Sequence, residues 1–228
     1  MEATRWPEVW REGRELFTRN AEPGTKVYGE PLRSVDGVEY RRWDPWRSKL
    51  AALLLNGAPA DLLVPPRAVL YLGGAHGTTV SHLSDLWPGV PLYVVEKSPS
   101  AFAALLALAR RRANLLPILA DAQLPERYRA DVGEVDLLYQ DVAQRDQARI
   151  FRENAEACLG RDGRGLLMLK VRSVTQRGSA AAVVRECRAS LGRAGLRVDG
   201  ELPLTPFARE HTALLVHAEG RRSPSAEA

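Results

Sequence analysis

Short apolar runs alternate with longer amphipathic segments along most of this chain. The short runs predict buried strands, and the segments with helical spacing of apolar residues predict helices. Such alternation favours an α/β fold, with a mostly parallel sheet and helices on both of its faces. The expected strands are Val69–Leu72, Leu92–Val95, Leu115–Leu119, Val135–Tyr139, Gly165–Leu169, Arg197–Leu204 and Thr212–His217, and the expected helices are Thr79–Leu86, Ser100–Arg112, Gln147–Leu159 and Ala180–Gly192.

The first 45 residues follow a different pattern. Asp36-Gly37 lies between alternating residues and predicts a hairpin turn, so residues 1–45 are expected to form a small β-rich N-terminal domain. Asp44 suits a helix N-cap and Pro45 the first helical position, which predicts a helix from there to Gly57. Residues 46–219 are expected to form the larger domain, and the polar residues 220–228 a disordered tail.

Composition narrows the possible classes of protein. No run approaches the ~18 apolar residues that cross a membrane, and Met1–Asn20 does not resemble a secretory signal, so a cytoplasmic protein with no membrane partner is expected. The two cysteines, Cys158 and Cys187, have no metal-binding spacing; we expect buried thiols and no metal. The net charge of +4 permits an anionic partner such as RNA without requiring one.

A glycine-rich turn follows the strand Val69–Leu72. Gly73, Gly74 and Gly77 precede a helical segment, and a strand–glycine turn–helix unit presents backbone N–H groups to a ligand. Glu96 ends the next strand about 20 positions on, where an acid suits ribose hydroxyls. Together they indicate an adenosine-containing cofactor, although glycines in such turns also serve close packing alone.

Further polar residues stand where other strands end, at the edge where parallel sheets bind ligands. They are Asp121, Asp141 and Lys170. A pair between Lys170 and Asp141 could bind a hydroxyl nucleophile and direct its proton away. The alternatives are a helix cap for each aspartate and a strand end reaching solvent for the lysine. His211, just before the final strand, could be a catalytic residue or a hydrogen-bonded structural histidine. His76 lies within the glycine-rich turn, where it could touch the cofactor or only shape the turn.

Several motifs together resemble the fibrillarin-like RNA 2′-O-methyltransferases, of the short archaeal type without a glycine–arginine-rich region. They are Val27-Tyr-Gly-Glu, Glu39-Tyr-Arg-Arg-Trp-Asp-Pro-Trp-Arg-Ser-Lys-Leu-Ala-Ala, Gly77-Thr-Thr-Val-Ser-His, Asp141-Val-Ala-Gln-Arg-Asp-Gln-Ala-Arg-Ile and Glu210-His-Thr. The resemblance runs from about Lys26 to His217. It implies a class I S-adenosylmethionine-dependent methyltransferase fold, Rossmann-like, with a small β-rich N-terminal domain.

The resemblance also implies a site. Its catalytic residues would be Lys49, Asp141, Lys170 and His211, with Lys170 and Asp141 holding the ribose hydroxyl. Glu96 would bind the cofactor ribose, and Asp121 with Ala122 the adenine edge, while Gly73, Thr78 and Thr79 would line the methionine end. The full implied cofactor set is Gly73, Ala75, Gly77, Thr78, Thr79, Glu96, Lys97, Asp121, Ala122, Asp141 and Gln144.

The implied activity is 2′-O-methylation of ribose in rRNA, with tRNA as a further candidate, by the catalytic subunit of a box C/D guide RNA–protein particle. The implied partners are a Nop-domain scaffold protein, a kink-turn-binding ribosomal-type protein and the guide RNA. Two alternatives stay open: a stand-alone methyltransferase acting on protein glutamine or another substrate, and a non-catalytic structural subunit. The chain departs from the family at His76, where a small serine is usual, and at Lys97, where an aromatic residue commonly stacks on adenine. Residues 1–25 and Val171-Arg172 are also atypical of the family.

Overall fold

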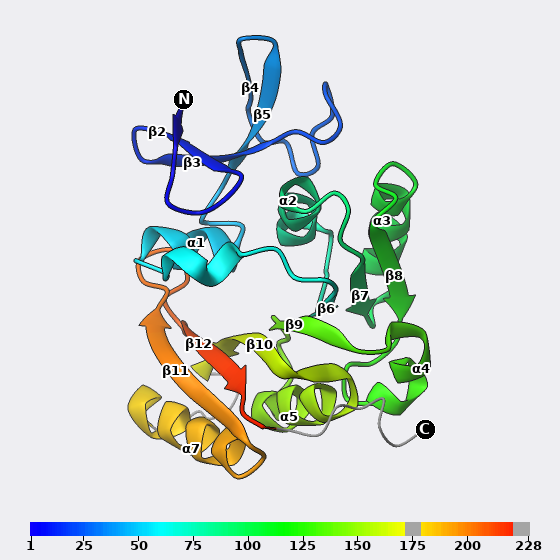
Figure 1. Ribbon diagram of the computed structural model, residues 1–228, viewed down its shortest axis with the longest axis vertical. Helices are drawn as coiled ribbons and strands as arrows, with labels where there is room; N and C mark the ends of the chain where they lie inside the picture. Colours follow the sequence, from blue (N-terminus) through cyan, green and yellow to red (C-terminus); the bar gives the residue numbers. More distant parts are fainter. Residues whose placement is uncertain (172–178, 221–228) are drawn as a thin grey trace.

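The computed structural model describes residues 1–171 and 179–220, and two β-sheets organise these parts of the chain (Figure 1). The N-terminal sheet is antiparallel and has the order β1-β2-β3-β5-β4. The turn between β4 and β5 is the hairpin predicted at Asp36-Gly37, and both residues have positive φ. The strands are β1 (Glu2–Ala3), β2 (Val9–Glu12), β3 (Glu15–Arg19), β4 (Leu32–Val35) and β5 (Val38–Trp43).

The larger sheet has the order β11-β12-β10-β9-β6-β7-β8. The five strands from β10 to β8 are parallel, whereas β12 runs antiparallel to both β10 and β11. The predicted mostly parallel sheet is therefore confirmed. Its strands are β6 (Val69–Leu72), β7 (Leu92–Glu96), β8 (Leu115–Leu119), β9 (Val135–Gln140), β10 (Leu159–Lys170), β11 (Leu196–Pro203) and β12 (His211–Ala218).

Helices cover both faces of this sheet, as predicted (Figure 1). Leu53 of α1, Leu83 of α2 and Leu105 of α3 pack into the core on one face, and Phe151 of α5 and Val184 of α7 into the core on the other. Within the described residues no helix is long and apolar enough to cross a membrane. The helices are α1 (Lys49–Leu55), α2 (Thr78–Leu86), α3 (Pro99–Ala109), α4 (Arg129–Val132), α5 (Gln147–Cys158) and α7 (Ala180–Gly192), with short 3-10 helices η1 (Ala60–Leu63) and η2 (Pro125–Arg127).

The predicted start of α1 at Asp44-Pro45 is wrong. The helix begins at Lys49, and the N-cap is Ser48, whose hydroxyl accepts a hydrogen bond from the Ala51 N–H. Asp44 instead closes the preceding turn, because its carbonyl accepts hydrogen bonds from the N–H groups of the two residues before Lys49. The Trp43 indole at the end of β5 donates to the Ser48 hydroxyl over 2.9 Å. Lys49 is thus the first residue of a helix that starts from the N-terminal sheet.

The predicted end of the third helix at Arg112 is also wrong. α3 ends at Ala109, and Arg112 turns inward instead of lying at the exposed end of a helix. Its Nη1 atom lies 2.7 Å from Oδ1 of Asp85 in α2. This buried ion pair outweighs continuation of the helix, because a buried carboxylate needs a charged partner.

The N-terminal sheet contacts α2 through that same carboxylate. Arg41 of β5 lies with its Nε 2.9 Å from Asp85 Oδ2 and its Nη1 2.5 Å from Glu30 Oε1, and these side chains are fully buried. His82 of α2 stacks on Trp43 with ring centroids 4.9 Å apart. The two sheets are therefore joined by a buried polar network. The division into domains at residue 45 stays a prediction, and the predicted tail lies outside the described residues apart from Gly220.

Candidate active site

A cavity of about 340 Å³ lies beyond the carboxyl ends of β6, β7 and β9. This is the edge at which open parallel sheets bind ligands, and the volume falls in the range of small-molecule sites. The wall includes most of the residues expected to bind the cofactor. It is lined by Gly73, Ala75, Val95, Glu96, Lys97, Ala120, Ala122, Asp141, Val142, Ala143 and Gln144.

Gly73 allows two strand ends to approach closely at this cavity. Its φ is +85°, and a Cβ atom there would lie 2.2 Å from the Asp141 carbonyl oxygen. The Asp141 N–H also donates to the Leu72 carbonyl over 2.9 Å. Both the backbone conformation and the contact exclude a side chain, so Gly73 sets the position of Asp141 at the cavity wall.

Glu96 shapes the glycine turn from the neighbouring strand. Its Oε2 accepts a hydrogen bond of 2.9 Å from the Ala75 N–H, and its Oε1 one of 2.8 Å from the Ser98 N–H. Ala75 has a φ of +46°, an uncommon conformation for a residue with a side chain. The carboxylate thus holds a strained turn, and its remaining lone pairs can still accept from hydroxyls of a ligand.

Asp121 and its neighbours form a second polar group at the cavity. Gln144, on the wall, donates from Nε2 to Asp121 Oδ1 over 2.8 Å, and Lys97 Nζ lies 4.0 Å from Oδ2. Burial acts to raise the pKa of Asp121, but hydrogen bonds from Gln123 and Gln144 and the charge of Lys97 lower it overall. Asp121 is therefore ionised and orients Gln144, although it is not itself part of the wall.

Besides Asp121, three more of the expected cofactor residues lie outside the cavity wall. Gly77 is the N-cap of α2 with a φ of +84°, and a Cβ there would lie 2.8 Å from Leu108 Cδ2. Thr79 is buried, with its hydroxyl 3.0 Å from that of Ser48. Thr78 opens α2. For Gly77 and Thr79 the structure thus supplies a packing role and a hydrogen bond to the start of α1.

An ion pair connects α1 to the end of β9. Lys49 Nζ lies 2.7 Å from Asp141 Oδ2, and the two side chains are 26% and 20% exposed. The sequence suggested Lys170 as a possible partner of Asp141. The ion pair in the structure is with Lys49, which approaches from a helix 92 residues away in sequence. The carboxylate is therefore charge-paired yet still accessible from solvent.

Lys170 and His211 complete this group. They are register partners at the ends of the antiparallel strands β10 and β12. Burial first, and then the positive charges of Lys49 and Lys170, lower the pKa of His211 to about 4. The imidazole is consequently neutral at pH 7 and can accept a proton or a hydrogen bond. The four residues predicted as a catalytic set thus come together from α1, β9, β10 and β12.

Two tyrosines beneath this set were not anticipated. Tyr71 and Tyr139 are buried and stack with ring centroids 4.4 Å apart. Burial, followed by the charge of Asp141, raises the pKa of Tyr71 well above its ordinary value, so this phenol stays protonated near Asp141. The period of two along a strand places Tyr139 on the same face as Asp141, a signal that could have revealed it.

Acidic and sulfur-containing side chains do not gather into a metal site here. Over residues 1–171 and 179–220, no group of three or more His, Cys, Asp or Glu residues is placed to hold a metal ion. Cys158 and Cys187 are free and buried, as predicted. Burial raises the pKa of Cys158 to about 11 and that of Cys187 to about 12, which keeps both thiols protonated.

A mostly parallel seven-stranded sheet with one reversed strand, and a cofactor-sized cavity at its carboxyl edge, defines a class I S-adenosylmethionine-dependent methyltransferase fold. The chain belongs to the fibrillarin family, whose pattern matches residues 4–220. Similarity to individual proteins extends over most of the chain.

The fibrillarin-like rRNA/tRNA 2′-O-methyltransferase of Methanothermobacter thermautotrophicus is 44% identical, over 88% of this chain and 90% of that protein. Aeropyrum pernix fibrillarin, solved with natively bound S-adenosyl-L-methionine, is 38% identical at a TM-score of 0.85, covering 94% of this chain and 96% of that one. A fibrillarin solved in complex with Nop5p is 36% identical, also at 0.85, covering 96% of this chain and 100% of that one.

Proposed function

We propose that this chain transfers a methyl group from S-adenosylmethionine to the ribose 2′-hydroxyl of rRNA, and of tRNA, as the catalytic subunit of a box C/D guide RNA–protein particle. One observation carries the proposal. Four side chains meet at the same edge of the sheet, beside a cavity of about 340 Å³: Lys49, Asp141, Lys170 and His211. The activity named for the relatives, rRNA/tRNA 2′-O-methylation, supports the same reaction.

The cavity suits the cofactor. Gly73 permits the close backbone approach that sets Asp141 at the wall, and Ala122 offers apolar surface, while Glu96 retains acceptor capacity for ribose hydroxyls. In this proposal Asp121 contributes at the adenine edge through Gln144, and Thr78 and Thr79 lie toward the methionine end. S-adenosylmethionine, when bound, supplies an electrophilic methyl group on a sulfonium centre.

The protein's task is then to place and deprotonate the hydroxyl. Asp141, fixed by Lys49, accepts a hydrogen bond from the 2′-hydroxyl and holds its oxygen in line with the methyl group. Alignment of this kind lowers a barrier by about 7–11 kcal/mol. Lys170 stabilises the negative charge that develops on the oxygen, and neutral His211 is available to take up the proton.

In this proposal the nucleotide to be methylated is selected by the partners of this chain and not by the chain itself. A relative of similar length was solved with Nop5p, which supports a Nop-domain scaffold for this chain as well. The guide RNA and a kink-turn-binding ribosomal-type protein complete the proposed particle, and a cytoplasmic location is part of the same proposal. The modest net charge of +4 suits a subunit that is brought to its RNA by others.

The test is radiolabelled methyl transfer in a reconstituted particle, with and without guide RNA, alongside calorimetric titration with S-adenosylmethionine. Lys170→Ala is expected to abolish transfer while cofactor binding persists, because Lys170 is not part of the cavity wall, and Asp141→Ala is expected to abolish transfer. Lys26→Ala provides a matched control, because Lys26 is an exposed lysine outside the site.

Transfer that needs no guide would favour a stand-alone enzyme, acting on protein glutamine or another substrate. A wild-type chain that binds no cofactor would instead indicate a structural subunit. Either result would overturn the proposed function.

A further inference from the structure

Trp46 is the most exposed of the large apolar side chains in the described residues, at 62%. It lies in the connection between β5 and α1, and its ring meets that of Phe207 edge-on, with centroids 5.1 Å apart and planes at 74°. Phe207 lies in the connection between β11 and β12, is partly buried and packs against the core. Packing in the core thus accounts for Phe207 but not for the exposed ring of Trp46, which Phe207 supports.

Both connections are held in place by hydrogen bonds. The Trp46 N–H donates to Asp44 Oδ1 over 2.9 Å. The Leu204 N–H donates to the His211 carbonyl over 3.0 Å and closes the loop that carries Phe207. Asn56 at the end of α1 donates to carbonyls of this loop, which reaches α1 in Figure 1. The aromatic pair is thus pre-ordered, which lowers the entropic cost of binding.

The pair belongs to the two segments that carry part of the catalytic set. Trp46 precedes Lys49 by three residues, and Phe207 precedes His211 by four. Arg47, beside Trp46, is exposed, and its guanidinium lies 6.0 Å from the centre of the Tyr28 ring. A substrate strand whose 2′-hydroxyl reaches Asp141 would extend toward these segments, since Asp141 pairs with Lys49 at the start of α1.

RNA geometry indicates what such a surface would contact. In an A-form duplex, as between guide and target, the 2′-hydroxyls lie in a wide and shallow minor groove. The bases there are already stacked, so an approaching aromatic ring meets the faces of the ribose rings and their C–H groups. Arg47 would add attraction to the phosphates on either side.

We propose that Trp46 and Phe207 form an aromatic platform that packs on ribose faces of the substrate strand, in the minor groove beside the methylated 2′-hydroxyl. The platform positions RNA and takes no part in cofactor binding. This inference rests on the proposed function and assigns to that site a contact with the nucleotides flanking the target.

The first test compares Trp46→Ala, Trp46→Phe and Phe207→Leu in the reconstituted particle. Trp46→Ala should raise KM for the target RNA by about tenfold, with a smaller change in kcat and unchanged affinity for S-adenosylmethionine. Trp46→Phe should have a KM for RNA close to that of the wild type, since it keeps an aromatic ring at this position. A merely structural role would lower kcat and thermal stability as well.

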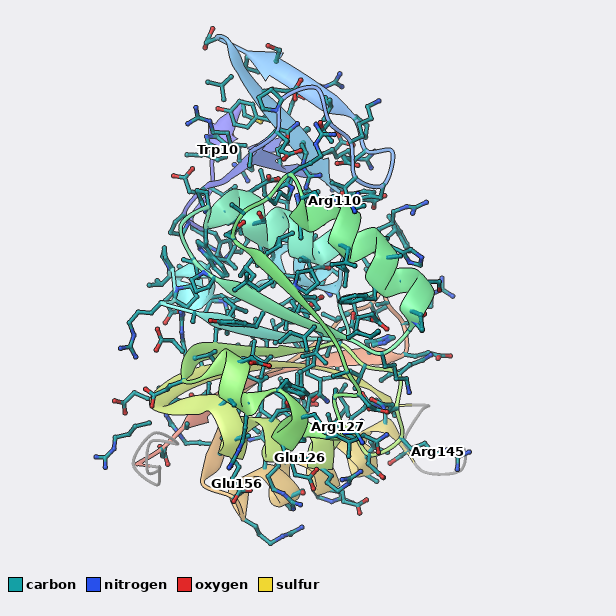
Figure 2. The ribbon with its side chains drawn as sticks, turned by 90° about the vertical axis from the view of Figure 1, so that its right-hand side faces the viewer. Trp10, Arg110, Glu126, Arg127, Arg145 and Glu156 are labelled. Carbon is teal, nitrogen blue, oxygen red and sulfur yellow. The ribbon has the colours of Figure 1, made fainter. Side chains whose placement is uncertain are left out.

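The matched control is Trp10→Ala. Trp10 of β2 meets Tyr40 edge-on at the same centroid distance of 5.1 Å, and Figure 2 shows it on the N-terminal sheet. This variant also removes a tryptophan from an aromatic pair, and it should leave KM for RNA unchanged. An RNA KM for Trp46→Ala equal to that of the wild type would overturn the platform.

The second test is independent of turnover. Trp46→benzoylphenylalanine should crosslink on irradiation to the substrate strand within a few nucleotides of the target, whereas Trp10→benzoylphenylalanine should not. Crosslinking of position 46 to the scaffold protein would overturn the inference and assign the pair to a protein interface. Failure of the proposed function would be separately visible: the wild-type particle would transfer no methyl group, although the Trp46→benzoylphenylalanine variant crosslinks to the RNA.

Discussion

Arg41 and Asp85 form an ion pair of 2.9 Å in which neither side chain has any exposed surface, and it joins the N-terminal sheet to α2. Each partner has a second ion pair, Arg41 with Glu30 and Asp85 with Arg112. Removal of one member of such a network leaves buried charges without compensation, which typically costs about 3–5 kcal/mol.

Arg41→Met is therefore expected to lower the free energy of unfolding by about that amount in urea denaturation followed by tryptophan fluorescence. Arg33→Met is the matched control, because Arg33 pairs with Glu12 over 3.7 Å and both side chains are 56% exposed. The control should change stability by less than about 1 kcal/mol. An equal decrease in the free energy of unfolding for the two variants would show that the buried pair stabilises the fold no more than the exposed pair does.

Gly73→Ala is expected to abolish binding of S-adenosylmethionine and to destabilise the fold. The new methyl group would lie 2.2 Å from the Asp141 carbonyl oxygen, so a strand end at the cavity must move. Gly37→Ala separates the two effects, since Gly37 also has a positive φ, +78°, but no atom within 4 Å of the added Cβ. The control should lose about 1–2 kcal/mol from backbone strain alone and keep its affinity in calorimetry. Normal cofactor binding by Gly73→Ala would contradict the tight approach.

The effect of His211 on the pH dependence of stability has a defined sign. Its pKa in the folded protein is about 4, below the ordinary 6.5, so the unfolded chain binds this proton first as the pH falls. The stability contributed by neutral His211 is present above about pH 6.5 and is lost as the pH falls toward 4. NMR titration of the imidazole should show no protonation between pH 8 and 5.

A titration of Lys49→Met should shift the His211 pKa upward, because a neighbouring positive charge has been removed. Lys26→Met should leave it unchanged. A wild-type midpoint near 6.5 would show that neither burial nor the two lysines act on this imidazole.

Lys97→Phe is expected to tighten binding of S-adenosylmethionine. Lys97 lines the cavity, and a phenyl ring there restores a face on which adenine can stack. Lys97→Ala is the control, since it removes the 4.0 Å contact with Asp121 without supplying a ring. Calorimetry should give an affinity in the order Phe, then Lys, then Ala at this position. Equal or weaker binding by the Phe variant would refute the stacking argument.

Much of the larger sheet could be predicted because its strands are encoded locally. The run at Val69–Leu72 is apolar throughout and ends in glycine, so both of its boundaries are marked in the sequence. The start of α1 could not be placed in the same way. Asp44-Pro45 carries the usual signals of a helix start, and the hydrogen bonds of the Ser48 hydroxyl with Trp43, Ala51 and Thr79 favour the later residue. Strands β1 to β3 were expected only as part of a β-rich segment.

The site shows the same division between local and distant information. Glu96 and Asp141 were found because each ends a strand, and parallel strands bring their ends together. The pairing of Lys49 with Asp141 could not be foreseen, since Lys49 comes from a helix whose direction depends on packing against the sheet. Arg112 was misjudged for a related reason. Its partner, Asp85, lies on another helix, and this contact cannot be predicted from the spacing of residues in the sequence.

The six residues from Trp43 to Ser48 also determine how far this chain tolerates insertion. The indole N–H of Trp43 reaches the Ser48 hydroxyl across the turn, so the end of β5 fixes the residue from which α1 begins. One added or deleted residue in this connection would rotate α1 by about 100° about its axis and withdraw Lys49 from Asp141. The connection is thus expected to accept changes of side chain at its exposed positions but no change of length, which makes it a fixed-length spacer among natural and engineered variants.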